Sequence, residues 1–138
     1  MDQSQNQKIK YHVLFISGSV CWQGILKDTF EKAGYIFHST IYALDAWENL
    51  QNGFECDVIW CCTELPKMDI IELFNLVKND DRFKDIPFFA LANRSHFANI
   101  INYNLLVRKM VGIEYFFTKP PLEDSVIEAT GEAILGFR

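Results

Sequence analysis

The stretch Asp57-Val-Ile-Trp-Cys-Cys-Thr-Glu-Leu-Pro-Lys-Met-Asp-Ile-Ile-Glu-Leu-Phe74 decides the fold of this chain. Its first part, 57–62, is an apolar run of the kind that forms a strand covered on both faces. Its second part predicts a helix, because Asp69 is a favourable N-cap residue and apolar residues follow it at helical spacing, namely Leu73, Phe74, Leu76 and Val77. The stretch therefore predicts a buried strand that leads through a short loop into a helix.

The same alternation extends in both directions from this stretch. Short runs rich in β-forming residues predict four more strands, at 11–17, 35–39, 88–92 and 114–118. Residues at helical spacing follow each strand, and Gly34 and Asn52-Gly53 are the predicted ends of the first two helices. Five strands that are each followed by a helix predict an α/β fold: a doubly wound, five-stranded parallel sheet of order 2-1-3-4-5, flavodoxin-like, with helices on both faces.

Length and composition exclude several classes of protein. The chain has 138 residues, which predicts one domain at 10–138 behind a polar, flexible tail at 1–9. The net charge is −5, so the chain lacks the excess of basic residues that nucleic-acid binding requires. No apolar run approaches the roughly 18 residues that a membrane span needs, so no membrane insertion is expected. The first ten residues contain no signal peptide, which predicts a cytoplasmic protein.

The four cysteines are Cys21, Cys56, Cys61 and Cys62. In a reducing compartment we expect free thiols, at least three of them buried as small apolar side chains. No Cys-x-x-Cys pair is present and the three histidines stand apart, so we expect neither a metal site nor a cofactor.

Parallel sheets of this kind bind ligands at the carboxyl ends of their strands. That rule selects four short segments of the chain: 17–19, 62–64, 92–93 and 118–120. The Ser17-Gly18-Ser19 loop, which enters a helix, is a possible anion site of the flavodoxin type.

Three motifs resemble those of response-regulator receiver domains. The 57–74 stretch is similar to the family's central strand, phosphoacceptor loop and helix, including its Leu-Pro and Met-Asp elements. Ile86-Pro87 and the following run resemble the fourth strand, and the Lys-Pro at 119–120 resembles the end of the fifth. The resemblance covers about residues 10–136 and implies the same sheet order.

The resemblance also implies that most of the family's phosphorylation site is missing. The acidic pair that holds Mg²⁺ falls on Ser17 and Gly18, and the phosphoacceptor aspartate falls on Cys62. The hydroxyl residue of the fourth strand falls on Ala92. Two positions keep the residue type of the family: its lysine matches Lys119, and its switch aromatic falls on Phe116. Without carboxylates there is nothing to hold Mg²⁺, so we expect no phosphorylation.

The sequence thus predicts an atypical receiver-like protein of two-component, phosphorelay signalling. It is expected to be no enzyme and to bind another signalling protein, or a second copy of itself, in trans. Two alternatives remain open on the same scaffold: a thiol redox sensor acting through Cys62, whose thiol would lie beside Lys119, and a flavodoxin-like binder of a small ligand.

The predicted interface is the fourth helix and its neighbours, the face that receivers commonly use for output. Tyr103, Arg108 and Lys109 lie in or near this helix, and Tyr and Arg are enriched at interfaces. The basic pair could instead merely complement the carboxyl end of the helix.

Overall fold

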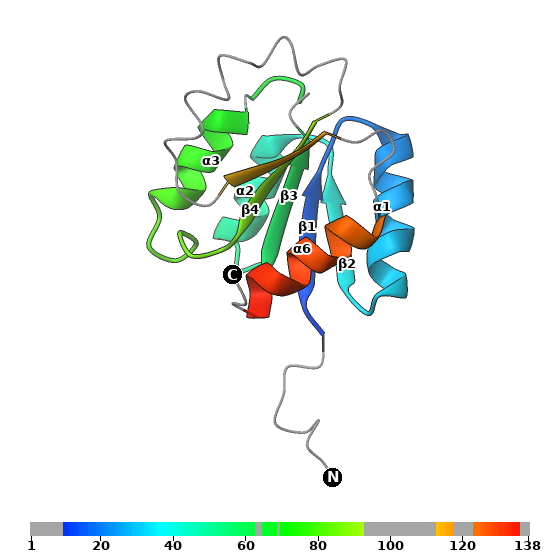
Figure 1. The fold of residues 1–138 in the computed structure, drawn as a ribbon. Coiled ribbons are helices and arrows are strands. Elements are labelled where there is room, and N and C mark those ends of the chain that lie inside the picture. The colour runs from blue at the N-terminus through cyan, green and yellow to red at the C-terminus, as the bar shows by residue number, and fades with distance from the viewer. Residues whose placement is uncertain (1–9, 63–64, 69, 93–112, 118–122, 136–138) are drawn as a thin grey trace.

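Strands and helices alternate along the chain. The computed structural model describes residues 10–62, 65–68, 70–92, 113–117 and 123–135 (Figure 1). Its elements, in chain order, are β1 (His12–Ile16), α1 (Val20–Lys32), β2 (Ile36–Thr40), α2 (Ala43–Gln51), β3 (Val58–Cys62), α3 (Ile70–Lys78), β4 (Phe88–Ala92), β5 (Ile113–Phe117) and α6 (Glu123–Leu135).

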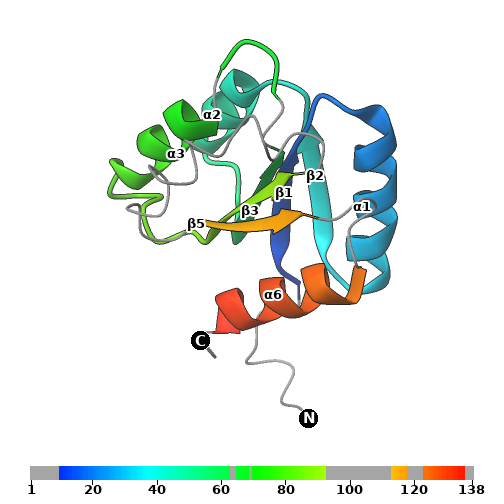
Figure 2. The same ribbon diagram turned by 45° about the horizontal axis from the view of Figure 1, so that its top comes forward.

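The strands form one sheet in the order β2-β1-β3-β4-β5, and every pairing is parallel. The predicted α/β class with a parallel sheet is therefore confirmed, and β2, β1, β3 and β4 follow the predicted order. β5 lies beside β4 at the sheet edge (Figure 2). Because all strands run the same way, their carboxyl ends lie at one edge of the sheet, where a site is expected.

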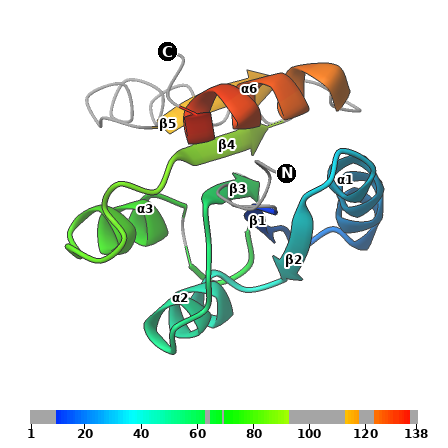
Figure 3. The same ribbon diagram turned by 90° about the horizontal axis from the view of Figure 1, so that it is seen from below.

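Helices cover both faces of the sheet, as Figure 3 shows from below. α2 and α3 pack on one face over a core that includes Leu14, Ile59 and Leu73. α1 and α6 pack on the other face over a core that includes Phe15, Trp60 and Val126. Side chains alternate between these two cores along β1 and β3, which explains why β3 and the part of β1 after His12 are apolar.

Local signals set the ends of the first two helices. Ser19 caps α1, since its hydroxyl accepts a hydrogen bond of 3.3 Å from the backbone N–H of Trp22. Gly34 and Gly53 follow α1 and α2 with φ angles of 94° and 92°, a left-handed conformation that glycine adopts at little cost.

The observed bounds differ from the predicted ones by a few residues. α2 begins at Ala43 rather than at residue 41, because Tyr42 keeps an extended backbone (φ −107°, ψ 137°) and serves as the N-cap. The predicted N-cap Asp69, the helix around 100–106 and the tail at 1–9 lie outside the described residues.

One prediction about the cysteines is wrong. Only Cys61 and Cys62 are buried; Cys56 is half-buried and Cys21 is exposed. Cys21 lies in the first turn of α1 and is not on the side that carries the buried Leu26 and Phe30. Cys56 lies just before β3, where its thiol donates to the carbonyl of Val58 at 3.3 Å.

Candidate functional site

The predicted site residues lie where the sheet topology requires. Ser17 directly follows β1, and the pairing of Ile16 with Cys61 brings it level with Cys62, the last residue of β3. Ala92 is the last residue of β4, and Phe116 pairs with Leu91 in β5. The carboxyl edge therefore brings the described positions of the predicted site together in the backbone. Lys119, Tyr103, Arg108 and Lys109 lie outside the described residues.

Hydrogen bonds to neighbouring residues already occupy polar groups of the loop after β1. Ser17 is 1% exposed, and its hydroxyl accepts a 3.0 Å hydrogen bond from the backbone N–H of Ser19. The side-chain amide of Gln23 donates to the carbonyls of Ser17 (2.9 Å) and Thr40 (3.3 Å). The N–H groups of Ser19 and Trp22, which an anion would need at this helix start, already have side-chain partners. The small-ligand alternative is not favoured.

Gly18 lies against the loop that follows β3. A Cβ atom built on Gly18 would be 3.3 Å from Cδ of Pro66, which is closer than ordinary van der Waals contact. A larger residue at this position would therefore press on the ring of Pro66 in the β3–α3 connection.

Cys62 is 8% exposed and packs with the apolar core shared with α1 and α6. Cys61 belongs to the opposite core, as alternation along a strand predicts. Burial, and secondarily the neighbouring Cys62, raises the pKa of the Cys61 thiol well above its ordinary value. A raised pKa keeps the Cys61 thiol protonated and unreactive. Cys62, the thiol that a redox role would use, is itself buried, and the two sulfurs face different cores. The redox alternative is not favoured either.

The described groups at this edge do not fit a magnesium ion. Magnesium requires hard oxygen ligands in near-octahedral geometry, usually including carboxylates. Ser17 offers a neutral hydroxyl that is already bonded, Gly18 offers no side chain, and Cys62 offers a thiol. Across the described part of the chain, no three His, Cys, Asp or Glu side chains gather as a metal centre would need.

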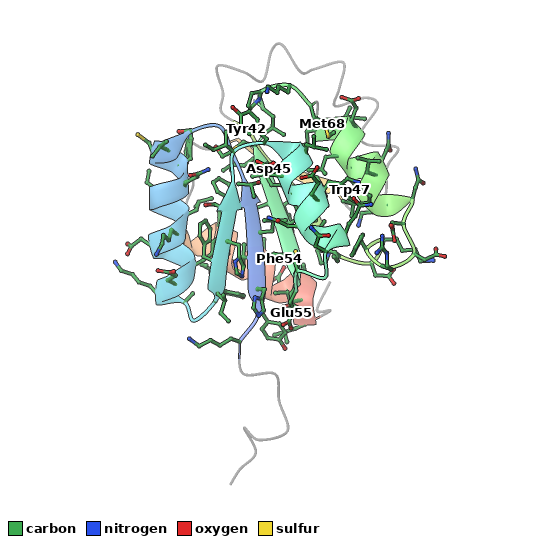
Figure 4. All side chains as sticks on the ribbon, turned by 180° about the vertical axis from the view of Figure 1, so that it is seen from behind. Tyr42, Asp45, Trp47, Phe54, Glu55 and Met68 are labelled. Atoms are coloured by element: carbon green, nitrogen blue, oxygen red, sulfur yellow. The ribbon has the colours of Figure 1, made fainter. Side chains whose placement is uncertain are left out.

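Sequence reasoning missed a second feature, a pair of open hollows at the start of α2. One measures about 520 Å³ and the other about 370 Å³, and Tyr42 and Asp45 line both. Figure 4 shows Tyr42, Asp45 and Met68 at the end of the molecule where α2 begins, while Phe54 and Glu55 lie toward the other end. A sequence signal for this surface exists, because Ile41, Tyr42 and Leu44 are apolar or aromatic but fall outside the buried face of the helix.

Comparisons with known proteins agree with this architecture. No family model matches the chain. The chemotaxis protein CheY1 of Helicobacter pylori is 25% identical over 126 residues, which cover 90% of this chain and 96% of the relative. The sensor histidine kinase CheAY of the same organism is 30% identical over 100 residues, 68% of this chain but 12% of that protein. The crystal structure of the chemotaxis response regulator CheY4 of Vibrio cholerae superimposes with a TM-score of 0.76 at 17% identity, covering 90% of this chain and 98% of that one.

The parallel sheet has a flavodoxin-like fold, and in sequence and architecture the chain is similar to response-regulator receiver domains of two-component signalling. The resemblance stated from the sequence is supported to this extent. In the described residues, no helix combines the length and the apolar character that a membrane crossing requires.

Proposed function

We propose that this chain is an atypical receiver domain that is not phosphorylated and acts by binding another signalling protein in trans. The observation that carries the proposal is the set of groups at the carboxyl edge of the sheet: a buried serine, a glycine and a buried cysteine at positions 17, 18 and 62. Phosphoryl transfer needs a cation to neutralise the developing charge, and these groups supply no carboxylate to hold one.

The relatives indicate the kind of partner. The similar proteins are named as a chemotaxis protein and a sensor histidine kinase, both of them signalling proteins. The domain's role in our proposal is therefore recognition, with no catalysis of its own. The binding face predicted at Tyr103, Arg108 and Lys109 remains part of the proposal.

Phosphate uptake tests the proposal directly. The purified protein is incubated with acetyl phosphate and Mg²⁺, and separately with beryllium fluoride and Mg²⁺, and its intact mass and Mg²⁺-dependent spectral changes are measured. We expect no phosphoryl mass addition and no response to beryllium fluoride, while a receiver that has the acidic pair and the aspartate responds in parallel.

The variant Cys62→Asp sharpens this test. This variant restores only the aspartate that accepts the phosphoryl group. It should still take up no phosphate, because positions 17 and 18 supply no carboxylate to hold Mg²⁺. A phosphoryl addition to the unaltered chain that disappears when Mg²⁺ is chelated would overturn the proposal.

A further inference from the structure

The two hollows at the start of α2 form one continuous surface around Tyr42. The larger hollow extends from Tyr42 toward β2 and the exposed side of α2, with Gln23, Ser39, Thr40, Asp45, Glu48 and Asn49 among its lining residues. The smaller hollow extends toward the residues before α3, lined by Leu44, Pro66, Lys67, Met68 and Glu72 among others. We call the two together the Tyr42 groove.

Apolar side chains are unusually exposed along this groove. Tyr42 is 38% exposed, Leu44 is 50% exposed, and the adjacent Ile41 is 41% exposed. These residues follow one another at the end of β2 and the start of α2. Three apolar or aromatic side chains exposed within four residues, beside open hollows, make this surface a candidate for binding a protein segment.

The aromatic ring of Tyr42 already contacts a cation. Nζ of Lys67 lies 4.9 Å from the centre of the ring, and Lys67 adopts a φ of 71°, which is costly for a residue with a side chain. The loop thus holds a cationic group over an exposed tyrosine. Tyr42 is nevertheless 38% exposed, so part of its side chain remains open to contact from a partner.

Two of the acidic residues that line the groove, Asp45 and Glu48, form no ion pair with another described residue. Both line the larger hollow. The exposed acids of α1 differ, since Glu31 pairs with Lys27 at 2.8 Å and Asp28 pairs with Lys32 at 3.0 Å. The groove therefore offers two carboxylates and an aromatic ring to a positively charged group.

We propose that the Tyr42 groove binds a segment of a partner protein that presents an arginine beside an apolar side chain. Arginine fits better than lysine, because its planar guanidinium can bond carboxylates in pairs and stack on an aromatic ring. The carboxylates of Asp45 and Glu48 receive the guanidinium, and the apolar neighbour enters the smaller hollow near Leu44 and Met68. This inference rests on the proposed function, because it names the class of partner that the domain recognises.

A peptide titration tests the groove. The isotopically labelled domain is titrated with the peptide Gly-Ser-Arg-Leu-Gly-Ser, without Mg²⁺ or phosphodonor, and its amide shifts are followed by NMR. We expect saturable shifts concentrated at residues 39–49 and 67–68, on the two sides of the groove, and much weaker binding when citrulline, which is uncharged, replaces the arginine. Equal binding of the two peptides, shifts confined to other surfaces, or no saturable shift would each overturn the inference.

Two double variants with the same change in net charge complete the test. Asp45→Asn with Glu48→Gln should weaken binding about tenfold, the size expected when one charge-assisted hydrogen bond is lost. Asp28→Asn with Glu31→Gln, on α1, should leave binding unchanged; an equal loss in both would overturn the inference. Because the titration contains no phosphodonor, phosphate uptake would overturn the proposed function without changing the result at the groove.

Discussion

Trp60 is the largest of the fully buried side chains, and its polar atom has a specific partner. Its indole N–H donates to the hydroxyl of Thr130 at 2.8 Å, and that hydroxyl donates in turn to the carbonyl of Val126 at 2.8 Å. Its ring stacks on Phe89 with centres 4.5 Å apart. A single residue of β3 is thereby joined both to its neighbouring strand and to α6.

Replacing Thr130 by valine tests this link. The change keeps the shape of the side chain but leaves the indole N–H of Trp60 without its acceptor in a buried site, so unfolding free energy should fall by about 1–3 kcal/mol. Chemical denaturation followed by tryptophan fluorescence measures this loss.

Thr29→Val provides the matched control. Thr29 is also buried, but its hydroxyl donates to the carbonyl of Ile25 one turn earlier in its own helix. Its removal should cost less than about 1 kcal/mol, because no buried donor loses an acceptor. Equal losses for the two variants would show that the bond between Trp60 and Thr130 contributes nothing specific.

Among the elements, α1 contains one glycine and is followed by another, and the two have opposite requirements. Gly34 follows the helix with a φ of 94°, so an alanine there should lower stability by about 1–2 kcal/mol. Gly24 lies within the helix, and a Cβ built on it meets nothing within 4 Å, so Gly24→Ala should raise stability by about 1 kcal/mol. Urea unfolding of both variants should show shifts in opposite directions; shifts of the same sign would contradict this account.

The elements themselves could largely be predicted from sequence. Fully buried strands such as β3 appear as continuous apolar runs, and a glycine such as Gly34 marks a helix end because the backbone conformation demands it. The start of α2 could not be predicted to the residue, because Tyr42 is as compatible with a helix as with the extended N-cap that it adopts.

The candidate site was only partly predictable, for a different reason. Parallel strands bring Ser17 and Cys62 to one edge whatever their chemistry, so their proximity follows from topology alone. The Tyr42 groove depends instead on two loops that are 25 positions apart, and on the ring of Tyr42 meeting the ammonium of Lys67. No periodicity in the sequence encodes that contact.

For the molecule as a whole, stability depends on the protonation of His38 in β2, whose ring stacks on His12 of β1. Nδ1 of His12 lies 3.1 Å from Nε2 of His38, and the two rings are stacked. Two acids approach His12 rather than His38: Glu55 lies 3.4 Å from its Nε2, and Asp57 accepts from its backbone N–H at 2.7 Å. Burial, and secondarily the charge of His12, lowers the pKa of His38.

A lowered histidine pKa means that the folded protein binds fewer protons than the unfolded chain at mildly acidic pH. Unfolding free energy should therefore fall as the pH drops below about 6.5, the ordinary value for histidine. The variant His38→Phe keeps a ring against Phe54 but cannot titrate, so its stability should fall less between about pH 7.5 and about pH 5.5. Parallel denaturant titrations of both proteins at each pH measure the difference. If unfolding free energy changes with pH equally in both proteins, His38 does not cause the pH dependence.

The contact between Gly18 and Pro66 also affects which residues position 18 can hold. An acidic residue at position 18 would place its Cβ 3.3 Å from the proline ring. The proline ring would have to move by a few tenths of an ångström to admit it. An acid at position 18 therefore carries a small packing cost that glycine does not, and the position of Pro66 is adjusted to the residue that faces it.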